Sequence, residues 1–243
     1  MQVEVVDHVA GAQSARGVAV VIDVFRAFSV AAYAFSRGVA TVIPVAAVDY
    51  ARELKKNHPD WLLIGERHAR PLPGFDCGNS PSDLEKLEVA GRTIIHTTHA
   101  GTQGLTNALR ADEVITGALV NAGAIVRYIQ ARQPSIVTIV RMGHEARESS
   151  DEDDLCAELL RSRLSGNPMP VAGIRERLRG ASSAQKFFDP ACDWAPERDF
   201  ELCTRVDEFD FVLQLDTGPA NSKPANSKAG PPRLRRIDVP KAV

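Results

Sequence analysis

The sequence has few cysteines and no long hydrophobic run, and both features narrow the class of protein. Its four cysteines form no Cys-x-x-Cys pair and are too few to staple a domain of 243 residues, so we expect reduced thiols. No stretch approaches the ~20 apolar residues that span a bilayer. The first residues include Glu4 and Asp7 and lack the basic start and apolar run of a secretory signal. We therefore predict a cytoplasmic protein with no membrane partner.

An excess of basic charge is also missing. Lysine and arginine total 29 against 31 acidic residues, for a net charge of −2. Nucleic-acid-binding proteins usually carry a basic excess or a basic stripe, so no nucleic-acid partner is expected. Hydrophobic residues make up 44% and charged residues 25% of the chain, which is typical of a globular domain. The sequence leaves open whether the protein forms a homo-oligomer.

Apolar, β-rich runs alternate with helix-period segments along most of the chain. The continuous β-branched run Val18–Ile22 predicts a strand that is covered on both faces. Further strands are expected at residues 3–9, 41–45, 61–64, 92–96, 113–116, 135–140 and 209–215, and helices at 27–37, 47–57, 102–109, 120–132 and 151–164. Strands separated by helices predict an α/β fold around a largely parallel sheet.

One domain is expected over residues 1–215. From Asp216 onward Gly, Pro, Asn, Ser and Lys dominate, and the pentapeptide Pro-Ala-Asn-Ser-Lys occurs twice in tandem. This composition cannot build a packed core. We therefore predict that residues 216–243 form a low-complexity, disordered C-terminal tail.

Polar residues follow the predicted strands at the edge where parallel sheets bind ligands. Asp23 and Arg26 come after the strand at 18–22, and Glu66 and Arg67 come after the strand at 61–64. A carboxylate beside a guanidinium suits Mg²⁺ next to a phosphate group. The alternative for the first pair is that Asp23 caps the following helix while Arg26 forms a structural ion pair.

Two loops further along the chain are candidates for binding an anion. Residues 65–79 form a long Gly/Pro loop that ends at Asn79, and Asn79 or Ser80 is expected to cap a short helix that begins at Pro81. In the second loop small hydroxyl residues and a glycine could surround a phosphate oxygen, although an ordinary strand-to-helix turn is the default. These residues are Thr97, Thr98, Gly101 and Thr102. The chain has no GxxxxGK[ST] motif, so a nucleotide P-loop is not supported.

Four successive acids, residues 151–154, begin another predicted helix. Capping by Ser150 and Asp153 accounts for them, and the alternative is that Glu152 or Asp153 joins Asp23 or Glu66 around Mg²⁺.

Other candidate side chains are three histidines and one cysteine. The chain has no HExxH spacing, so we expect the histidines to be polar lining of a site rather than zinc ligands. These histidines are His96, His99 and His144. Cys77 is either a nucleophile or, as is usual, a small buried apolar residue.

Taken in order, these motifs resemble the motif series of the 2-phosphosulfolactate phosphatase (ComB-like) family. The resemblance covers residues 18–215 and is carried by Asp23-Val24-Phe25-Arg26-Ala27, Gly65-Glu66-Arg67, Gly74-Phe75-Asp76-Cys77-Gly78-Asn79-Ser80-Pro81, Thr97-Thr98 with Gly101-Thr102, and Glu152-Asp153 with Cys156-Ala157. It implies a three-layer α/β/α sandwich and Mg²⁺-dependent hydrolysis of 2-phospho-3-sulfolactate to sulfolactate and phosphate, a step toward coenzyme M.

The resemblance also implies a role for each matching residue. The catalytic residues would be Asp23, Arg26, Glu66 and Arg67; the substrate-binding residues Asn79, Ser80, Thr97, Thr98, Gly101 and Thr102; and the metal ligands Asp23, Glu66, Glu152 and Asp153. The chain departs from the family at Phe28 beside Ser29, where hydroxyl residues are frequent, and at His99-Ala100, where the family often has Asn-Gly.

Two hypotheses compete with a phosphatase. One is a non-catalytic α/β protein that binds a phosphorylated metabolite. The other is an isomerase or lyase that acts on a phosphorylated small acid without releasing phosphate.

Overall fold

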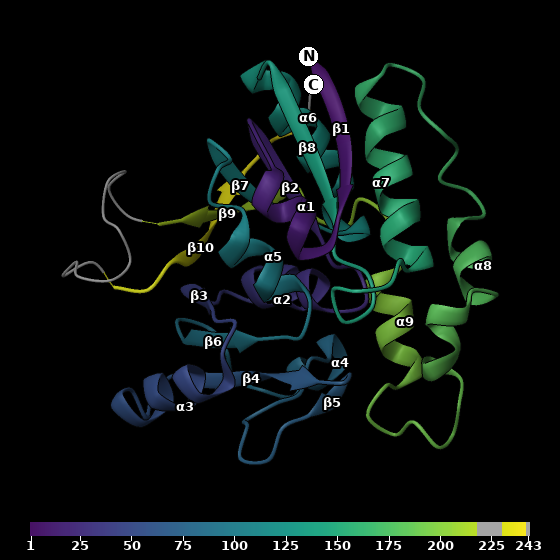
Figure 1. The fold of residues 1–243 in the computed structure, drawn as a ribbon. Helices are drawn as coiled ribbons and strands as arrows, with labels where there is room; N and C mark the ends of the chain where they lie inside the picture. Colours follow the sequence, from purple (N-terminus) through teal and green to yellow (C-terminus); the bar gives the residue numbers. More distant parts are fainter. Residues whose placement is uncertain (218–229, 242–243) are drawn as a thin grey trace.

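The protein is an α/β structure built on a mixed ten-stranded sheet with helices on its faces (Figure 1). The computed structural model describes residues 1–217 and 230–241. Its strand order is β1-β8-β2-β7-β9-β10-β3-β6-β4-β5. The predicted α/β class is confirmed.

Two sets of parallel strands make up most of the sheet. The first set consists of β1 (Gln2–Asp7), β8 (Ile136–Arg141), β2 (Val18–Ile22) and β7 (Glu113–Gly117). The second set consists of β3 (Thr41–Pro44), β6 (Thr93–Thr97) and β4 (Leu62–Arg67), and the short β5 (Arg70–Pro71) pairs antiparallel with β4 at the edge. Strands of a set that follow one another along the chain are connected through a helical segment, as crossovers between parallel strands require.

An antiparallel hairpin, β9 (Phe211–Asp216) and β10 (Arg233–Asp238), lies between the two sets. It pairs with each set through a single register pair, Ile115 with Gln214 and Leu234 with Val42. Three antiparallel pairings reverse the strand direction between the two sets, and the twist that accumulates along the sheet turns the second set toward the first. In Figure 1 β8 runs down the view and β4 runs across it, and the carboxyl ends of both point toward the side that carries α9.

Strand β10 corrects part of the predicted C-terminal tail. Residues 233–238 were expected to be disordered, yet they pair with β9 over six residues and bury Leu234. Two apolar residues, Leu234 and Ile237, suffice for this strand because β9 already supplies a hydrogen-bonding edge. Asp216, the first residue of the predicted tail, is the last residue of β9, and residues 218–229 and 242–243 of the tail lie outside the described residues.

Helices cover both faces of the sheet. Their bounds are α1 (His8–Ser14), α2 (Ala27–Ser36), α3 (Val48–Asn57), α4 (Pro81–Leu84), α5 (Gly101–Asn107), η1 (Leu119–Asn121), α6 (Ala122–Arg132), α7 (Asp151–Leu164), α8 (Ile174–Arg179), η2 (Ser182–Phe187) and α9 (Glu197–Cys203). The helix predicted at 151–164 matches α7. The strand predicted at 3–9 ends earlier, because α1 begins at His8.

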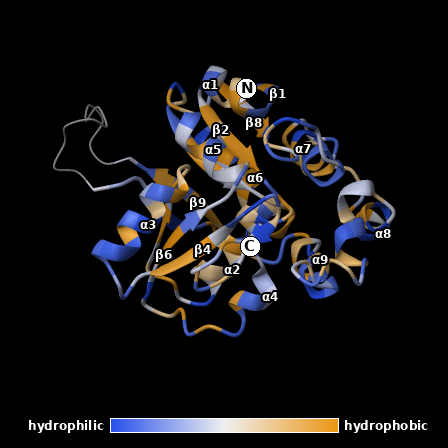
Figure 2. Cartoon of the chain, turned by 60° about the horizontal axis from the view of Figure 1, so that its bottom comes forward, coloured by the Kyte–Doolittle hydropathy of each residue, from blue (hydrophilic) through white to orange (hydrophobic). Residues whose placement is uncertain are grey.

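Alternation along β2 shows why the molecule has three layers. Ala19 and Val21 pack into one hydrophobic cluster with α2 and α5, whereas Val18, Val20 and Ile22 pack into a second cluster with α6 and α7. Successive side chains of a strand point to opposite faces, so each face of β2 needs its own helical cover. Figure 2 shows the resulting pattern, with apolar strands inside and hydrophilic helix surfaces outside. No helix among residues 1–217 and 230–241 is long and apolar enough to cross a membrane.

Candidate active site

A cavity of about 450 Å³ opens where the carboxyl ends of the two parallel sets meet. Its wall collects residues from after β2, from the end of β4, from after β6 and β8, from the start of α7 and from η2. The charged and polar side chains among them include Asp23, Arg26, Glu66, His68, Asn79, His99, His144, Glu145, Ser150, Glu152, Asp153, Ser183, Lys186 and Trp194. The cavity therefore unites acids that are distant in the sequence, as the sequence analysis expects.

Three buried carboxylates, Asp23, Glu152 and Asp153, form what we call the acidic floor of the cavity. Asp153 accepts hydrogen bonds from the backbone N–H of Val24 at 2.9 Å and of Gly143 at 2.8 Å. It thereby ties the loop after β2 to the loop after β8. Ser150 occupies the N-cap position of α7, but its hydroxyl makes no capping hydrogen bond. The capping box that the sequence predicts at this helix is therefore wrong. Glu152 and Asp153, at the start of α7, both line the cavity.

The floor concentrates negative charge away from water. Burial, helped by the negative charges of Glu66 and Glu152, raises the pKa of Asp23 to about 7. Burial and the neighbouring Glu152 and Asp23 raise the pKa of Asp153 well above its ordinary value. Burial also raises the pKa of Glu152, although the ammonium group of Lys186 opposes that shift. Carboxylates in this state attract a cation strongly.

The carboxylate of Asp23 contacts the start of α2 with one oxygen and the start of α5 with the other. Asp23 Oδ1 accepts from the backbone N–H of Ala27 at 3.0 Å, so the carboxylate caps the first turn of α2, as the alternative interpretation expects. A Cβ atom on Gly101 would lie 2.8 Å from Asp23 Oδ2. Only glycine leaves room for this carboxylate, which gives Gly101 a steric role in the site.

Glu66 holds two loops of the cavity wall together. Its Oε1 accepts from the backbone N–H of His99 at 2.7 Å, and its Oε2 accepts from the backbone N–H of Ala69 at 2.8 Å. A Cβ atom on the preceding Gly65, whose φ is +147°, would lie 1.9 Å from the carbonyl oxygen of Thr97. Glycine at this position therefore lets β4 approach β6 closely enough to bring Glu66 to the cavity.

Arg26 lines the cavity but is engaged in a buried ion pair that the sequence could not assign. Its Nη1 donates to Asp199 Oδ2 at 2.6 Å and to the carbonyl oxygen of Trp194 at 3.0 Å, and its Nη2 donates to the carbonyl oxygen of Ala69 at 3.1 Å. Asp199 also accepts from the hydroxyl of Ser82 at 2.7 Å. This is the structural ion pair that the sequence analysis gives as the alternative for Arg26.

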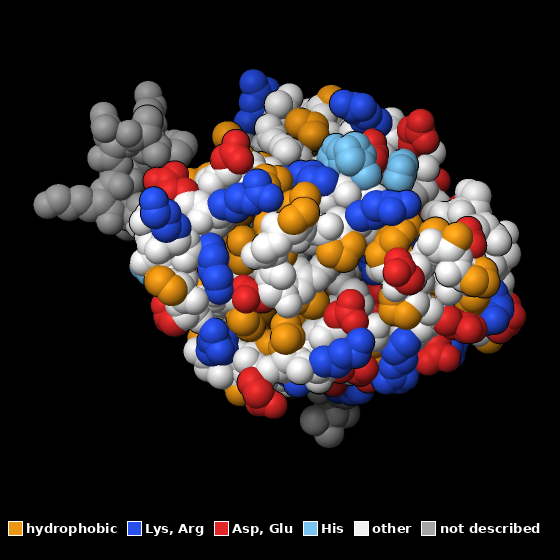
Figure 3. All heavy atoms as spheres, turned by 90° about the horizontal axis from the view of Figure 1, so that it is seen from below, with side chains coloured by type: hydrophobic (Ala, Val, Ile, Leu, Met, Phe, Trp, Pro, Cys, Tyr) orange, Lys and Arg blue, Asp and Glu red, His pale blue; other side chains and the backbone are white. Residues whose placement is uncertain are grey.

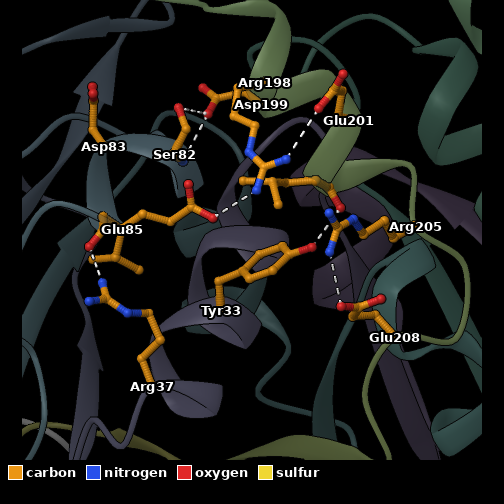
Figure 4. Close-up of polar contacts among 12 residues, drawn as sticks. Tyr33, Arg37, Ser82, Asp83, Glu85, Arg198, Asp199, Glu201, Arg205 and Glu208 are labelled. Carbon is orange, nitrogen blue, oxygen red and sulfur yellow. Dashed lines mark hydrogen bonds and ion pairs between the residues drawn. The ribbon is translucent and has the colours of Figure 1, made fainter.

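Arg198, which precedes Asp199 in the chain, forms its ion pairs at the surface. Figure 4 shows Ser82 directed at Asp199, whereas the adjacent Arg198 is directed at Glu85 and Glu201. Both of the Arg198 pairs are exposed. Successive residues of α9 therefore serve a buried network and a solvated one.

Several predicted site residues do not line the cavity. Their polar groups are used in local hydrogen bonds instead. Arg67 donates to the backbone oxygens of Glu66 and Ala46 and to Thr97 Oγ1, and Ser80 caps α4 and donates to Asp199. Thr98 and Thr102 hydrogen-bond each other at the start of α5. These residues shape the loops around the cavity, and of the predicted substrate-binding set only Asn79 lies in its wall.

The segment from Gly166 to Arg198, to which the sequence assigns no role, supplies one side of the cavity through Ser183, Lys186 and Trp194. Burial lowers the pKa of Lys186, while Glu152 opposes that shift. Its Nζ lies 5.2 Å from the centre of the Phe187 ring. No helix period or motif marks these residues, so the sequence offered no signal for them.

Buried polar atoms without a partner concentrate at this cavity. Six such side-chain atoms occur among the described residues, and five of them belong to residues of the cavity wall. The five are His99 Nδ1, Ser150 Oγ, Glu152 Oε2, Ser183 Oγ and Trp194 Nε1. Because buried polar groups in folded proteins are nearly always hydrogen-bonded, this concentration indicates a site prepared for a polar ligand.

His68, His99 and Glu145 form a second polar group, which we call the histidine rim. One potential ligand atom from each lies within 4.8 Å of the others, so the group could hold a metal ion. The histidines were predicted to be polar lining, and His144 is an exposed part of the wall. His96 instead lies buried behind the wall, with Nε2 3.0 Å from Asn79 Oδ1.

Cys77 is not part of the cavity wall. Burial raises the pKa of its thiol to about 12, which disfavours the thiolate that a nucleophile requires. All four cysteines are free.

Comparison with known proteins identifies the family. The family model for 2-phosphosulpholactate phosphatase matches residues 4–218 of this chain. The chain belongs to the 2-phosphosulfolactate phosphatase family. A probable 2-phosphosulfolactate phosphatase of Caldanaerobacter subterraneus is 44% identical over 222 residues, which cover 82% of this chain and 88% of the relative.

Two further relatives with the same description support the assignment. The protein of Thermotoga petrophila is 35% identical over 82% of this chain and 89% of its own length. The protein of Bacillus subtilis is 32% identical over 81% of this chain and 86% of its own length. The predicted family and the predicted class of enzyme, a phosphoric monoester hydrolase, are confirmed, and such a family implies a small phosphorylated substrate.

Proposed function

We propose that the protein is a Mg²⁺-dependent phosphatase that converts 2-phospho-3-sulfolactate, or a closely related phosphate monoester of a small hydroxy acid, to the hydroxy acid and phosphate. The observation that carries the proposal is the cluster of unpartnered buried polar atoms around one cavity that also contains the acidic floor. The family supports the same reaction. A cytoplasmic location and a place in a coenzyme M type pathway belong to the proposal as well.

The acidic floor has the chemistry to hold Mg²⁺. The ion prefers carboxylate and water oxygens in an octahedral shell. Glu152 Oε2 is buried and has no partner, and Asp23 and Asp153 add charge that the floor itself does not neutralise. Glu66 lies in the same wall, but both of its oxygens already accept backbone hydrogen bonds. Both oxygens of Asp153 likewise accept backbone hydrogen bonds, from Val24 and Gly143. We therefore propose Asp23 and Glu152 as the principal ligands, with Asp153 and Glu66 as supports of the adjoining loops.

Residues beside the floor in the cavity wall would bind the substrate's oxygens. Lys186 provides a positive charge, and Trp194 Nε1 and Ser183 Oγ provide donors that have no partner within the described protein. When bound, Mg²⁺ would neutralise phosphate charge and orient the phosphoryl group. The donors of the chain would then stabilise the charge that develops as water attacks phosphorus and the phosphate ester bond breaks. The guanidinium of Arg26 is already paired with Asp199. It would therefore add positive charge to the site without contacting the phosphate.

The proposal assigns a different role to the arginines from that in the sequence analysis. Arg67 lies outside the cavity wall and Arg26 is paired, so neither is proposed to bind phosphate directly. We propose Lys186 in that role, since its side chain reaches the cavity and faces Glu152.

Release of inorganic phosphate from a panel of phosphorylated hydroxy acids, with Mg²⁺ and with a chelator, tests the proposal. We expect release only with Mg²⁺, and most rapidly from a substrate with a second anionic group. Binding of the panel without turnover would favour a non-catalytic protein. Conversion of a substrate without phosphate release would favour an isomerase or lyase, and either outcome would overturn the proposed hydrolysis.

A further inference from the structure

We propose that the histidine rim, His68, His99 and Glu145, binds a divalent transition-metal ion of the Zn²⁺ class at a site separate from the acidic floor. The three residues follow three different strands, β4, β6 and β8, and meet at the cavity wall. The proposal does not depend on which substrate the enzyme hydrolyses.

The three potential ligand atoms are gathered at one point of the cavity wall, and an ion would replace the direct contact between His68 and Glu145. His68 Nδ1 is 2.5 Å and His99 Nδ1 is 3.8 Å from the same oxygen, Glu145 Oε1. The two imidazole rings lie edge to face with their centres 5.0 Å apart. His99 Nδ1 is buried and has no hydrogen-bond partner, so this nitrogen has a free position toward the other two residues. An ion between the three atoms would satisfy it.

The backbone holds the rim in place. Glu66 accepts hydrogen bonds from the backbone N–H of Ala69 and of His99, which fixes the two histidine loops relative to each other. Glu145 lies in a tight turn closed by the backbone hydrogen bond from His144 to Glu148 at 2.8 Å. The ligands therefore sit on loops that are tied down at their bases. Figure 3 shows histidine side chains gathered at the surface beside an acidic side chain.

The donor set decides the class of ion. Two imidazole nitrogens and one carboxylate suit Zn²⁺ and neighbouring transition metals, whereas Mg²⁺ prefers an all-oxygen shell such as the acidic floor. Three protein ligands leave at least one coordination position for water or for an anionic group in the cavity. The two groups in one cavity would therefore select different ions.

A simple ion pair between His68 and Glu145 is the competing explanation. The side chain of His68 is 71% exposed, and exposed pairs contribute little to stability. That pair alone leaves His99 Nδ1 without a partner, although its ring faces the same carboxylate. Metal binding accounts for all three residues.

Calorimetric titration of the metal-free protein with Zn²⁺, in the presence of excess Mg²⁺ to occupy the floor, tests the proposal. We expect one Zn²⁺ per chain and a higher midpoint of thermal unfolding, because a ligand that binds only the folded state stabilises it. The variants His99→Asn and Glu145→Gln should each bind Zn²⁺ at least about tenfold more weakly, since even outer-sphere changes cost that much.

His8→Asn is the matched control, because it also removes one histidine but lies outside the cavity wall, in a left-handed position that asparagine tolerates. It should bind Zn²⁺ as the wild type does. Unfolding of the metal-free variants, followed in parallel, shows whether each variant is folded. Absence of saturable Zn²⁺ binding by the wild type, or wild-type affinity in folded His99→Asn, would overturn the proposal.

Discussion

The acidic floor and the histidine rim line the same cavity, but they differ in burial, in donor atoms and in how the chain supports them. Asp23, Glu152 and Asp153 are at most 8% exposed, whereas the side chain of His68 is 71% exposed. The floor offers oxygen atoms alone, and the rim offers two nitrogen atoms and an oxygen. As proposed, one cavity would therefore hold two kinds of cation, one at the buried floor and one at the more exposed rim.

The largest expected effect comes from the support behind the floor. Asp199→Asn leaves the buried guanidinium of Arg26 without its charged partner, and such a loss typically costs about 3–5 kcal/mol of unfolding free energy. Arg198→Ala removes only the neighbouring exposed pairs and should cost about 1 kcal/mol or less. Urea unfolding of both variants measures the difference. Equal losses would show that burial does not distinguish the two networks.

The floor itself should matter more to activity than to stability. Asp23→Asn should lower the rate of phosphate release by roughly 100- to 1000-fold, the cost of removing one preorganised charged or polar group at a reacting centre. Its unfolding free energy should not fall, because burial already disfavours the charged form of Asp23. Steady-state kinetics and urea unfolding of the variant check both expectations. Near-normal turnover would remove Asp23 from the site.

The buried His96, behind the cavity wall, should make the unfolding free energy of the protein depend on pH. Burial lowers its pKa from 6.5 to about 4, so below pH 6.5 the unfolded chain binds a proton there that the folded chain does not. The unfolding free energy should therefore fall between about pH 6.5 and pH 4 by roughly 3 kcal/mol from this residue. His96→Gln, which keeps a donor for Asn79, should remove that part of the acid sensitivity. An unchanged pH profile of unfolding would contradict it.

The smallest effect is expected at the rim. In Mg²⁺ alone, His99→Asn should slow phosphate release much less than Asp23→Asn does, since its backbone N–H still donates to Glu66. A rate assay without Zn²⁺ measures this. A loss as large as that of Asp23→Asn would break the distinction between floor and rim.

Residues that follow strands were predictable, and residues placed by irregular segments were not. Asp23 and Glu66 follow from the strand pattern because they lie at the carboxyl ends of β2 and β4, and Asp153 lies in the first turn of α7, which follows β8. Lys186 and Trp194 belong to a stretch without periodicity, so only the folded chain reveals them. The arginines were also ambiguous, since a guanidinium that can bind phosphate can equally pair with a distant carboxylate such as Asp199.

The strands of the sheet also differ in how well the sequence pattern predicts them. Continuous apolar runs marked the parallel strands, whereas β10 has only Leu234 and Ile237 among charged residues. Its pairing depends on the long-range edge that β9 provides, which no local pattern encodes.

The Mg²⁺ dependence of phosphate release, compared between Glu152→Gln and His99→Asn, tests the central claim most directly. The account predicts that Glu152→Gln needs at least about tenfold more Mg²⁺ for half-maximal activity, as expected for loss of a metal contact, while His99→Asn responds as the wild type does. A shifted Mg²⁺ requirement in His99→Asn with none in Glu152→Gln would contradict the account.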